Sequence, residues 1–418
     1  MNFTLFRLIF GTYLIVHLLT LFPYAPDLFS QEGLIQDPTL NPLSLPSIIN
    51  SRTSAYVTVG LGVLCSLAFT LNAHRRPAAL LLAVILHLLF LRNNLTSNPS
   101  LPYLNLLLVL SAFLPKNPTR EQCEDPVRVA AFLLALGYTF SGLTKLSSPS
   151  WLDGSAFYHV LNNPLARTNL AQELALLTPE AFLQIFTWGA LTAELLFLPL
   201  WIWKGSRPWI WLTLVSMHLG LIFVVDFADL SLGMIMVHLF IFDPRWIPSR
   251  KAKNGLPIQV SFDADCLMCN GFIRFLSQQD FQNSLRFHPL PSDSPKDTLL
   301  ALRDGQASQK SGAVMTALET LGGEWRVLAI GLHLSPRALN DAVYVLIAKN
   351  RHRLSSLFRN FRSGKAGTHS CSLPPAKLQR QLAPAWLTLP LLRPSPPSLW
   401  WVLTALAAVL FLTPGQGA

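Results

Sequence analysis

Long runs of apolar residues, separated by short polar loops, fill residues 1–245 of the chain. A helix needs about 20 mostly apolar residues to cross the hydrocarbon core of a membrane. Eight segments approach this length: 4–22, 55–72, 77–92, 101–115, 126–146, 180–203, 208–225 and 229–243. The pattern predicts an α-helical polytopic membrane bundle of about eight spans. Because no small-x-small cleavage site follows the first apolar run, we expect it to be a retained helix.

A different pattern begins at residue 251, where polar and apolar residues mix as in an ordinary soluble domain. Residues 256–262 (LPIQVSF) are typical of a buried strand, and 270–279 place apolar side chains at helical spacing. We therefore expect a small α/β domain after the bundle.

Three regions follow from the two patterns: a transmembrane bundle over 1–250, an α/β domain over 251–392, and a C-terminal membrane segment over 393–418. The last apolar run, 399–413, is short for a span. A ninth helix and an interfacial anchor both remain open for it.

The composition strengthens the membrane interpretation, because 51% of the residues are hydrophobic and only 13% are charged. The net charge of +10 is uneven: residues 251–392 hold 17 Lys/Arg against 9 Asp/Glu, and residues 1–250 hold 14 against 13. The segment 349–380 has eight basic residues and no acidic one. Beside a membrane domain, this segment favours anionic lipid as a partner over nucleic acid.

Orientation follows from the loops between the predicted spans, since basic residues are enriched on the cytoplasmic side. Only Arg52, Arg92 and Arg167 fall on one side of the predicted bundle. Ten basic residues fall on the other: Arg75, Arg76, Lys116, Arg120, Lys204, Arg207, Arg245, Arg250, Lys251 and Lys253. We expect the N-terminus and the α/β domain to be cytoplasmic, and the protein to lie in a bacterial inner membrane.

Only one of the cysteine spacings forms a motif. Cys266 and Cys269 make a CxxC pair between the predicted strand and the predicted helix. The other cysteines are Cys65, Cys123 and Cys371. The N-terminus of a helix favours an anion, so we expect Cys266 to be the attacking thiolate. Cys269, one turn inside the helix, is then the resolving thiol.

Less specific interpretations of this region stay open. The pair forms half of a metal site if Cys371 and His369 supply the other ligands, or the two thiols are idle. Asp263 and Asp265 precede the helix, where aspartate commonly serves as an N-cap. Their negative charge would also oppose a thiolate on Cys266.

Residues around the pair resemble the DCC family of thiol-disulfide oxidoreductases. The resemblance spans about 258–375 and is carried by 262–270 (FDADCLMCN), 304–305, 313–323, 341–351 and 371–374 (CSLP). It implies a thioredoxin-like fold and disulfide reductase activity through Cys266 and Cys269, with no cofactor required. Asp263, Asp265 and Cys371 are candidate accessory residues.

Ionisable side chains within membrane spans are costly and often functional. Lys145, Glu194, His218, Asp226 and His238 lie within or beside the predicted spans. Lys145 lies at the end of its predicted helix, where it is either a catalytic residue or a positively charged anchor of the helix end. His218 and His238 either take part in catalysis or form hydrogen bonds between helices.

Part of the bundle resembles the HTTM transmembrane domain of vitamin K-dependent gamma-glutamyl carboxylase. The residues concerned are 138–146 (YTFSGLTKL) with Trp151 and Gly154, and 218–246. The resemblance implies that Lys145 is a base that deprotonates a quinol bound in the bundle. The large lumenal domain of the carboxylase has no counterpart in this sequence.

Three functional hypotheses result. The leading one is a membrane-bound thiol-disulfide oxidoreductase of the protein-disulfide reductase type, which acts on a protein or small-molecule disulfide through Cys266 and Cys269. The second is a quinol-dependent, carboxylase-like or peptide-maturing membrane enzyme that uses Lys145, with the dithiol domain as an accessory. The third is a membrane scaffold whose CxxC pair is a sensor.

Overall fold

The computed structural model describes residues 2–34, 51–93, 96, 98–116, 118–164, 166, 168–226, 228–290 and 298–351. The chain divides into two compact units. We call the described residues up to Phe242 the helical unit, and those from Asp243 to Arg351 the dithiol unit. Three predictions lie outside the described residues: the site formed with His369 and Cys371, most of the basic segment 349–380, and the C-terminal segment 393–418.

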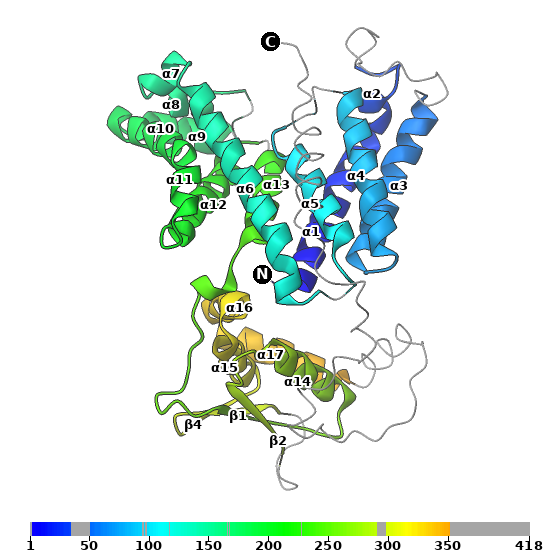
Figure 1. Ribbon diagram of the computed structural model, residues 1–418, viewed down its shortest axis with the longest axis vertical. Coiled ribbons are helices and arrows are strands. Elements are labelled where there is room, and N and C mark those ends of the chain that lie inside the picture. Colours follow the sequence, from blue (N-terminus) through cyan, green and yellow to red (C-terminus); the bar gives the residue numbers. More distant parts are fainter. Residues whose placement is uncertain are drawn as a thin grey trace. The chain divides into compact units, whose positions relative to one another are not determined.

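The helical unit is built almost entirely of helices, and all eight predicted segments are helical (Figure 1). Their bounds are α1 Phe3–Leu21, η1 Phe22–Tyr24, α2 Ala25–Phe29, α3 Arg52–Thr70, α4 Arg75–Arg92, α5 Leu101–Phe113, α6 Arg120–Lys145, α7 Pro149–Leu152, α8 Ala156–Leu161, α9 Thr168–Leu177, α10 Glu180–Leu195, α11 Phe197–Ile202, α12 Arg207–Val224 and α13 Ala228–Ile241.

Fewer helices than predicted have the length and composition of a membrane span. Within the described residues the candidates are Phe3–Phe29, Arg52–Thr70, Arg120–Lys145 and Arg207–Val224. The bent pair Asn169–Leu177 and Glu180–Leu195, at 112°, gives up to five. The prediction of eight spans is not shown, because α5 and α13 have only 13 and 14 residues and α4 begins and ends with arginine.

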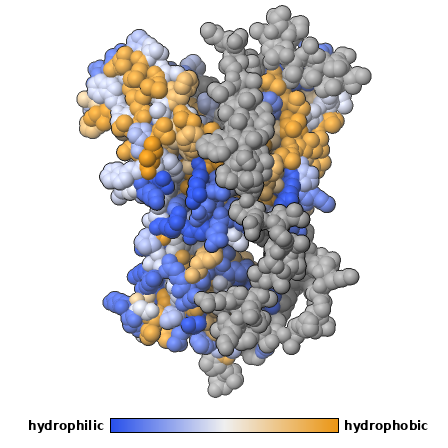
Figure 2. All heavy atoms as spheres, viewed as in Figure 1, coloured by the Kyte–Doolittle hydropathy of each residue, from blue (hydrophilic) through white to orange (hydrophobic). Residues whose placement is uncertain are grey.

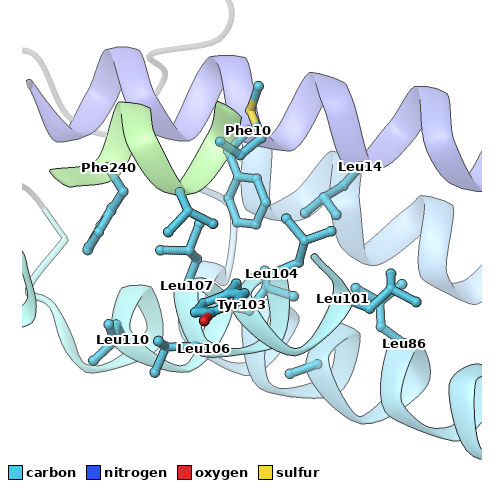
Figure 3. Packing of buried hydrophobic residues seen from close by; sticks show 14 of the residues in the cluster. Phe10, Leu14, Leu86, Leu101, Tyr103, Leu104, Leu106, Leu107, Leu110 and Phe240 are labelled. Atoms are coloured by element: carbon cyan, nitrogen blue, oxygen red, sulfur yellow. The ribbon is translucent and has the colours of Figure 1, made fainter. Parts of the chain in front are cut away.

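The core of the helical unit consists of aliphatic and aromatic side chains from α1, α3, α4, α5, α6 and α13. Figure 3 shows Phe10 and Leu14 of α1 and Phe240 of α13 facing the leucines of α5 across this core. Hydrophobic residues also gather on the outer surface of the helices (Figure 2). Such a surface suits contact with lipid rather than water.

Two buried arginines bind the ends of helices in this unit. Arg7 donates from Nη1 to the carbonyl of Phe69, at 3.1 Å, near the end of α3. Arg75 donates from Nη2 to the carbonyl of Leu114, at 2.6 Å, just after α5. The last carbonyls of a helix have few partners within it, so these guanidinium groups provide hydrogen bonds at the helix ends. The Phe69 carbonyl also accepts from the backbone N–H of Asn72 at 3.1 Å.

The dithiol unit contains a small mixed sheet of β1 Ile258–Phe262, β2 Leu285–Pro289, β3 Leu300–Arg303 and β4 Gln306–Gln309. The strand order is β2-β1-β3-β4, with β1 and β2 parallel and the other pairs antiparallel. Short helices complete the unit: η4 Pro244–Trp246, α14 Leu267–Gln279, α15 Ser311–Leu321, α16 Gly323–Leu334 and α17 Arg337–Lys349 (Figure 1).

Packing in this unit explains why the sheet forms. Ile258, Val260 and Phe262 of β1 are buried, while Gln259 between them is exposed, so one face of the strand enters the core. Helix α15 contacts β1, β3 and β4, and α14 and α17 contact α15 in turn. The apolar side of α14 joins the same core, because Ile273 and Leu276 are buried in one hydrophobic cluster with the β1 side chains.

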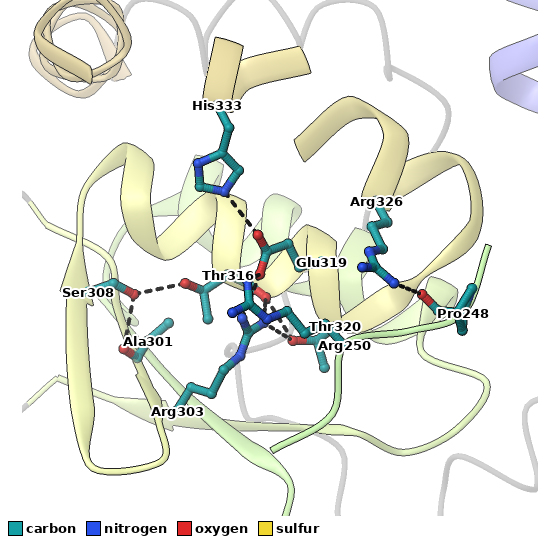
Figure 4. A network of polar contacts seen from close by, with 10 residues as sticks. All are labelled: Pro248, Arg250, Ala301, Arg303, Ser308, Thr316, Glu319, Thr320, Arg326 and His333. Carbon is teal, nitrogen blue, oxygen red and sulfur yellow. Dashed lines mark hydrogen bonds and ion pairs between the residues drawn. The ribbon is translucent and has the colours of Figure 1, made fainter. Parts of the chain in front are cut away.

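A buried carboxylate on α15 links several parts of the dithiol unit (Figure 4). Glu319 accepts hydrogen bonds from Arg303 Nη1 at 2.5 Å, from His333 Nε2 at 2.9 Å and from Arg250 Nη1 at 3.3 Å. Burial alone would raise the pKa of Glu319, but the bonds from Arg303 and His333 bring it below its usual value. This network joins β3, α15 and α16.

Candidate dithiol site

The CxxC pair lies where the chain leaves β1 and enters α14. Cys266 is the N-cap of α14, and its Sγ accepts a hydrogen bond from the backbone N–H of Cys269 at 3.2 Å. Asn270 donates from Nδ2 to the carbonyls of Ala264, at 2.7 Å, and Cys266, at 3.0 Å, which fixes the turn. The predicted strand-to-helix position of the pair is confirmed.

The two aspartates before the helix have roles other than capping. Asp263 accepts a hydrogen bond from the backbone N–H of Asp265 at 3.0 Å, which closes a turn. Its other oxygen lies 3.5 Å from Nη1 of Arg351, just beyond the end of α17. The predicted capping role is wrong, because Cys266 occupies the N-cap. Asp263 is only 7% exposed, so Arg351 compensates a buried charge.

The two thiols, both free, differ in environment. The Cys266 residue is 3% exposed, whereas Cys269 is half-buried and lines a pocket beside the sheet. Burial, the hydrogen bond with the Cys266 sulfur and the nearby charges of Cys266 and Asp263 raise the pKa of Cys269 to about 12. Cys269 therefore stays protonated at neutral pH.

Residues of α17 complete the pocket, and reasoning from the sequence did not single them out as site residues. Tyr344, Ile347, Ala348 and Arg351 all line it. Burial raises the pKa of Tyr344 to about 12, and the nearby cysteine sulfurs add to this shift. Their spacing of i, i+3, i+4 and i+7 places them on one face of a helix. The helical periodicity of the sequence could therefore have shown that these four side chains lie together.

A second group of polar side chains lies in the helical unit around Lys145. Its Nζ forms an ion pair with Glu194 of α10, lies 2.9 Å from Oγ of Ser141, and sits 4.9 Å from the centre of the Trp151 ring. Lys145 is therefore bound within the unit and does not act only as a positive anchor at a helix end.

The predicted interhelical hydrogen bonds of the two histidines are confirmed. Oη of Tyr138 on α6 lies 2.8 Å from Nε2 of His218 on α12 and 2.9 Å from Nε2 of His238 on α13. Nδ1 of His218 lies 3.4 Å from Oγ of Ser231. Asp226 lies in the connection between α12 and α13.

A third group of polar side chains, around Asp229, was not predicted from the sequence. Asp229 at the start of α13 accepts hydrogen bonds from Tyr13 at 2.8 Å and Asn98 at 3.0 Å, and it lies 2.9 Å from Nδ1 of His17. These partners come from segments more than 100 residues away, and no local pattern connects them with the aspartate.

Comparison with known proteins concerns the dithiol unit. Residues 260–357 match the family model described as DCC1-like thiol-disulfide oxidoreductase. An uncharacterised Bacillus subtilis protein, YuxK, is 27% identical over 136 residues, which are 29% of this chain and 91% of that protein. A chloroplastic DCC family protein of Arabidopsis thaliana is 30% identical over 108 residues. The alignment covers 22% of this chain and 62% of the plant protein. No solved structure matches this chain significantly.

These matches support a DCC1-like thiol-disulfide oxidoreductase domain over residues 260–357, as the sequence motif predicted. They support oxidoreductase activity for this domain. The predicted relation of the helical unit to the HTTM domain and to the vitamin K-dependent carboxylase is not shown by any of them.

Proposed function

We propose that this protein is a membrane-bound thiol-disulfide oxidoreductase of the disulfide reductase type. The observation that carries the proposal is the 3.2 Å contact between the Cys269 amide and the Cys266 sulfur at the start of α14, within the region that matches the family. The strand order β2-β1-β3-β4, with CxxC directly after β1, supports a thioredoxin-like fold.

Exchange proceeds in two steps in this proposal. The Cys266 thiolate attacks one sulfur of the substrate disulfide, a mixed disulfide forms, and the first substrate sulfur leaves and takes up a proton. Cys269 then loses its proton and attacks Cys266 Sγ, so that the second substrate sulfur leaves and is protonated. Two electrons and two protons pass to the substrate, and an external thiol reductant restores the Cys266–Cys269 dithiol.

Asp263 is the carboxylate placed to accept the proton of Cys269 in the second step. It lines the same pocket as Cys269, and its charge contributes to the raised pKa of that thiol. The ion pair with Arg351 keeps the carboxylate in position in the buried turn. Burial and the nearby charges, that of Asp263 among them, hold Cys269 protonated before attack, and Asp263 receives its proton during attack.

The candidate spans of the helical unit support anchoring of the dithiol unit to a membrane. We place the N-terminus and the dithiol unit in the cytoplasm of a bacterial cell, because basic residues favour that side. A reducing cytoplasm favours the dithiol form and hence reductase over oxidase work. Anionic lipid is the expected partner of the basic residues in 349–380.

The test uses the full-length protein in detergent, with insulin as a general disulfide substrate and dithiothreitol as the reductant. We expect the wild-type protein to accelerate insulin reduction well above the rate with dithiothreitol alone. The double variant C266S/C269S should show only the background rate. An equal rate for both proteins, with the fold intact by circular dichroism, overturns the proposal.

A second candidate function rests on the buried ion pair of Lys145 and Glu194 beside Tyr138. In it, a quinol binds in the helical unit and Lys145 removes a proton from it. The carboxylate of Glu194 stabilises the charged ammonium, so Lys145 acts as a base only after it transfers a proton to Glu194. Loss of quinol deprotonation in Lys145→Met but not in Cys266→Ser is the result expected from this candidate. Quinol deprotonation that persists in Lys145→Met contradicts it.

A further inference from the structure

The pocket beside the dithiol has a defined shape and several walls. Its volume is about 260 Å³. The end of β1, the first turns of α14, the residues before β3, and the helices α15 and α17 all contribute to it. Cys269 lines the wall, so a ligand in the pocket lies against the resolving thiol, while Cys266 is 3% exposed and does not line the pocket.

The lining is almost entirely apolar. Apart from Asp263, Thr298 and Arg351, every lining residue is aliphatic, aromatic or sulfur-containing. The two charged residues form an ion pair with each other, so their charges largely compensate. A ligand with several uncompensated charges would lose its hydration here and find few polar partners.

The volume limits the ligand further. Pockets for drug-sized ligands occupy roughly 300–1,000 Å³, and about 30 Å³ is the share of one water molecule in the liquid. The dithiol pocket lies just below this range and therefore suits a small apolar group rather than a drug-sized ligand. Glutathione disulfide, with two charged tripeptide halves, fits neither the size nor the polarity of this lining.

From the size and the lining together we infer that the pocket selects disulfides that carry a short aliphatic or aromatic group next to the sulfur. This inference rests on the proposed function, and the exchange is the one given above, with the apolar group in the pocket during attack. The apolar group belongs either to a small organic disulfide or to a residue beside a cysteine of a protein substrate.

The first experiment measures the rate at which the reduced full-length protein in detergent reduces diethyl, dipropyl and dibutyl disulfide. Each rate is divided by the rate of dithiothreitol with the same disulfide, which removes intrinsic differences in reactivity. We expect a rise of about fourfold for each methylene until the pocket is full. Bis(2-hydroxyethyl) disulfide, which replaces the terminal methyl groups of the dipropyl compound with hydroxyls, should be slower than that compound.

Two variants of α17 test whether the preference for longer alkyl groups arises in the dithiol pocket. Ala348→Phe places a ring in the pocket and should remove the preference for longer alkyl groups. Ala342→Phe lies on the same helix, is exposed and does not line the pocket, so the preference should remain. Equal normalised rates across the series in the wild-type protein overturn this inference, whereas the absence of any disulfide reduction overturns the proposed function itself.

A pair of disulfide-linked peptides with Leu or Ser beside the cysteine separates the two sources of the apolar group. A faster reaction with the Leu peptide assigns the pocket to protein substrates. If the preference appears with the alkyl disulfides but not with the peptides, the pocket serves small organic disulfides.

Discussion

The dithiol and the cluster around Tyr138 both contain ionisable side chains in contact, but their members come together over very different distances along the chain. Cys266 and Cys269 are three residues apart, and one turn of α14 creates the contact between them. Tyr138 meets His218 and His238, which lie 80 and 100 residues further along the chain and on two other helices.

This difference has consequences for stability and for chemistry. The thiol contact depends on local helix geometry, so removal of one thiol should change the reaction more than the fold. The histidine contacts depend on the packing of α6, α12 and α13, so removal of Tyr138 should loosen that packing. The predictions below test this contrast, beginning with the largest effect.

Substitution of either thiol should abolish turnover. For Cys266→Ser and for Cys269→Ser we expect a loss on the order of a thousandfold in disulfide reduction, because the two groups act as a unit. Cys269→Ser should also accumulate a mixed disulfide between Cys266 and the substrate, detectable by mass spectrometry of the intact protein. Accumulation in Cys266→Ser, with the adduct on Cys269, would reverse the assigned order of attack.

Removal of the buried carboxylate of α15 should destabilise the dithiol unit. Glu319→Ala leaves Arg303 without its partner, and we expect a loss of about 3 kcal/mol in the free energy of unfolding. The measurement follows the exposure of Cys266 to a maleimide in increasing urea, by mass spectrometry of its peptide. Glu173→Ala, an exposed substitution in the helical unit, is the charge-matched control.

The effect of Glu319→Ala should depend on pH in one direction. Folding lowers the pKa of Glu319, so its carboxylate contributes fully above its usual pKa of about 4.3. The contribution is lost as the pH falls through the lowered value in the folded protein. The difference between wild type and variant should therefore shrink only below about pH 4, and a difference that grows on acidification would contradict the network.

Removal of the shared hydroxyl in the helical unit should have the smallest effect. Tyr138→Phe eliminates two interhelical hydrogen bonds, which together are worth about 1 kcal/mol in a membrane protein. The expected result is a small decrease in the Tm of the helical signal by circular dichroism in detergent, with disulfide reduction unchanged. Tyr158→Phe, an exposed position on α8, should leave the Tm unchanged.

The same contrast explains which features could be predicted from the sequence. The strand, the turn and the dithiol helix follow from local periodicity and helix N-terminal chemistry, and they were predicted correctly. The partnership of Asp263 with Arg351 was not predicted, because 88 residues separate them and only the tertiary fold brings them together. The predicted spans over α4, α5 and α13 are not shown, because hydropathy located these helices without fixing their lengths, and α4 carries arginines at both ends.

The most direct test of the account is a redox titration of the full-length protein in detergent, with Cys266 and Cys269 followed separately by differential alkylation and mass spectrometry. We expect both thiols to disappear together in a single two-electron transition, with about 30 mV for each tenfold change in the ratio of the two forms. If the two cysteines oxidise independently, or if neither responds reversibly, the pair is not a redox couple and the proposed function is wrong.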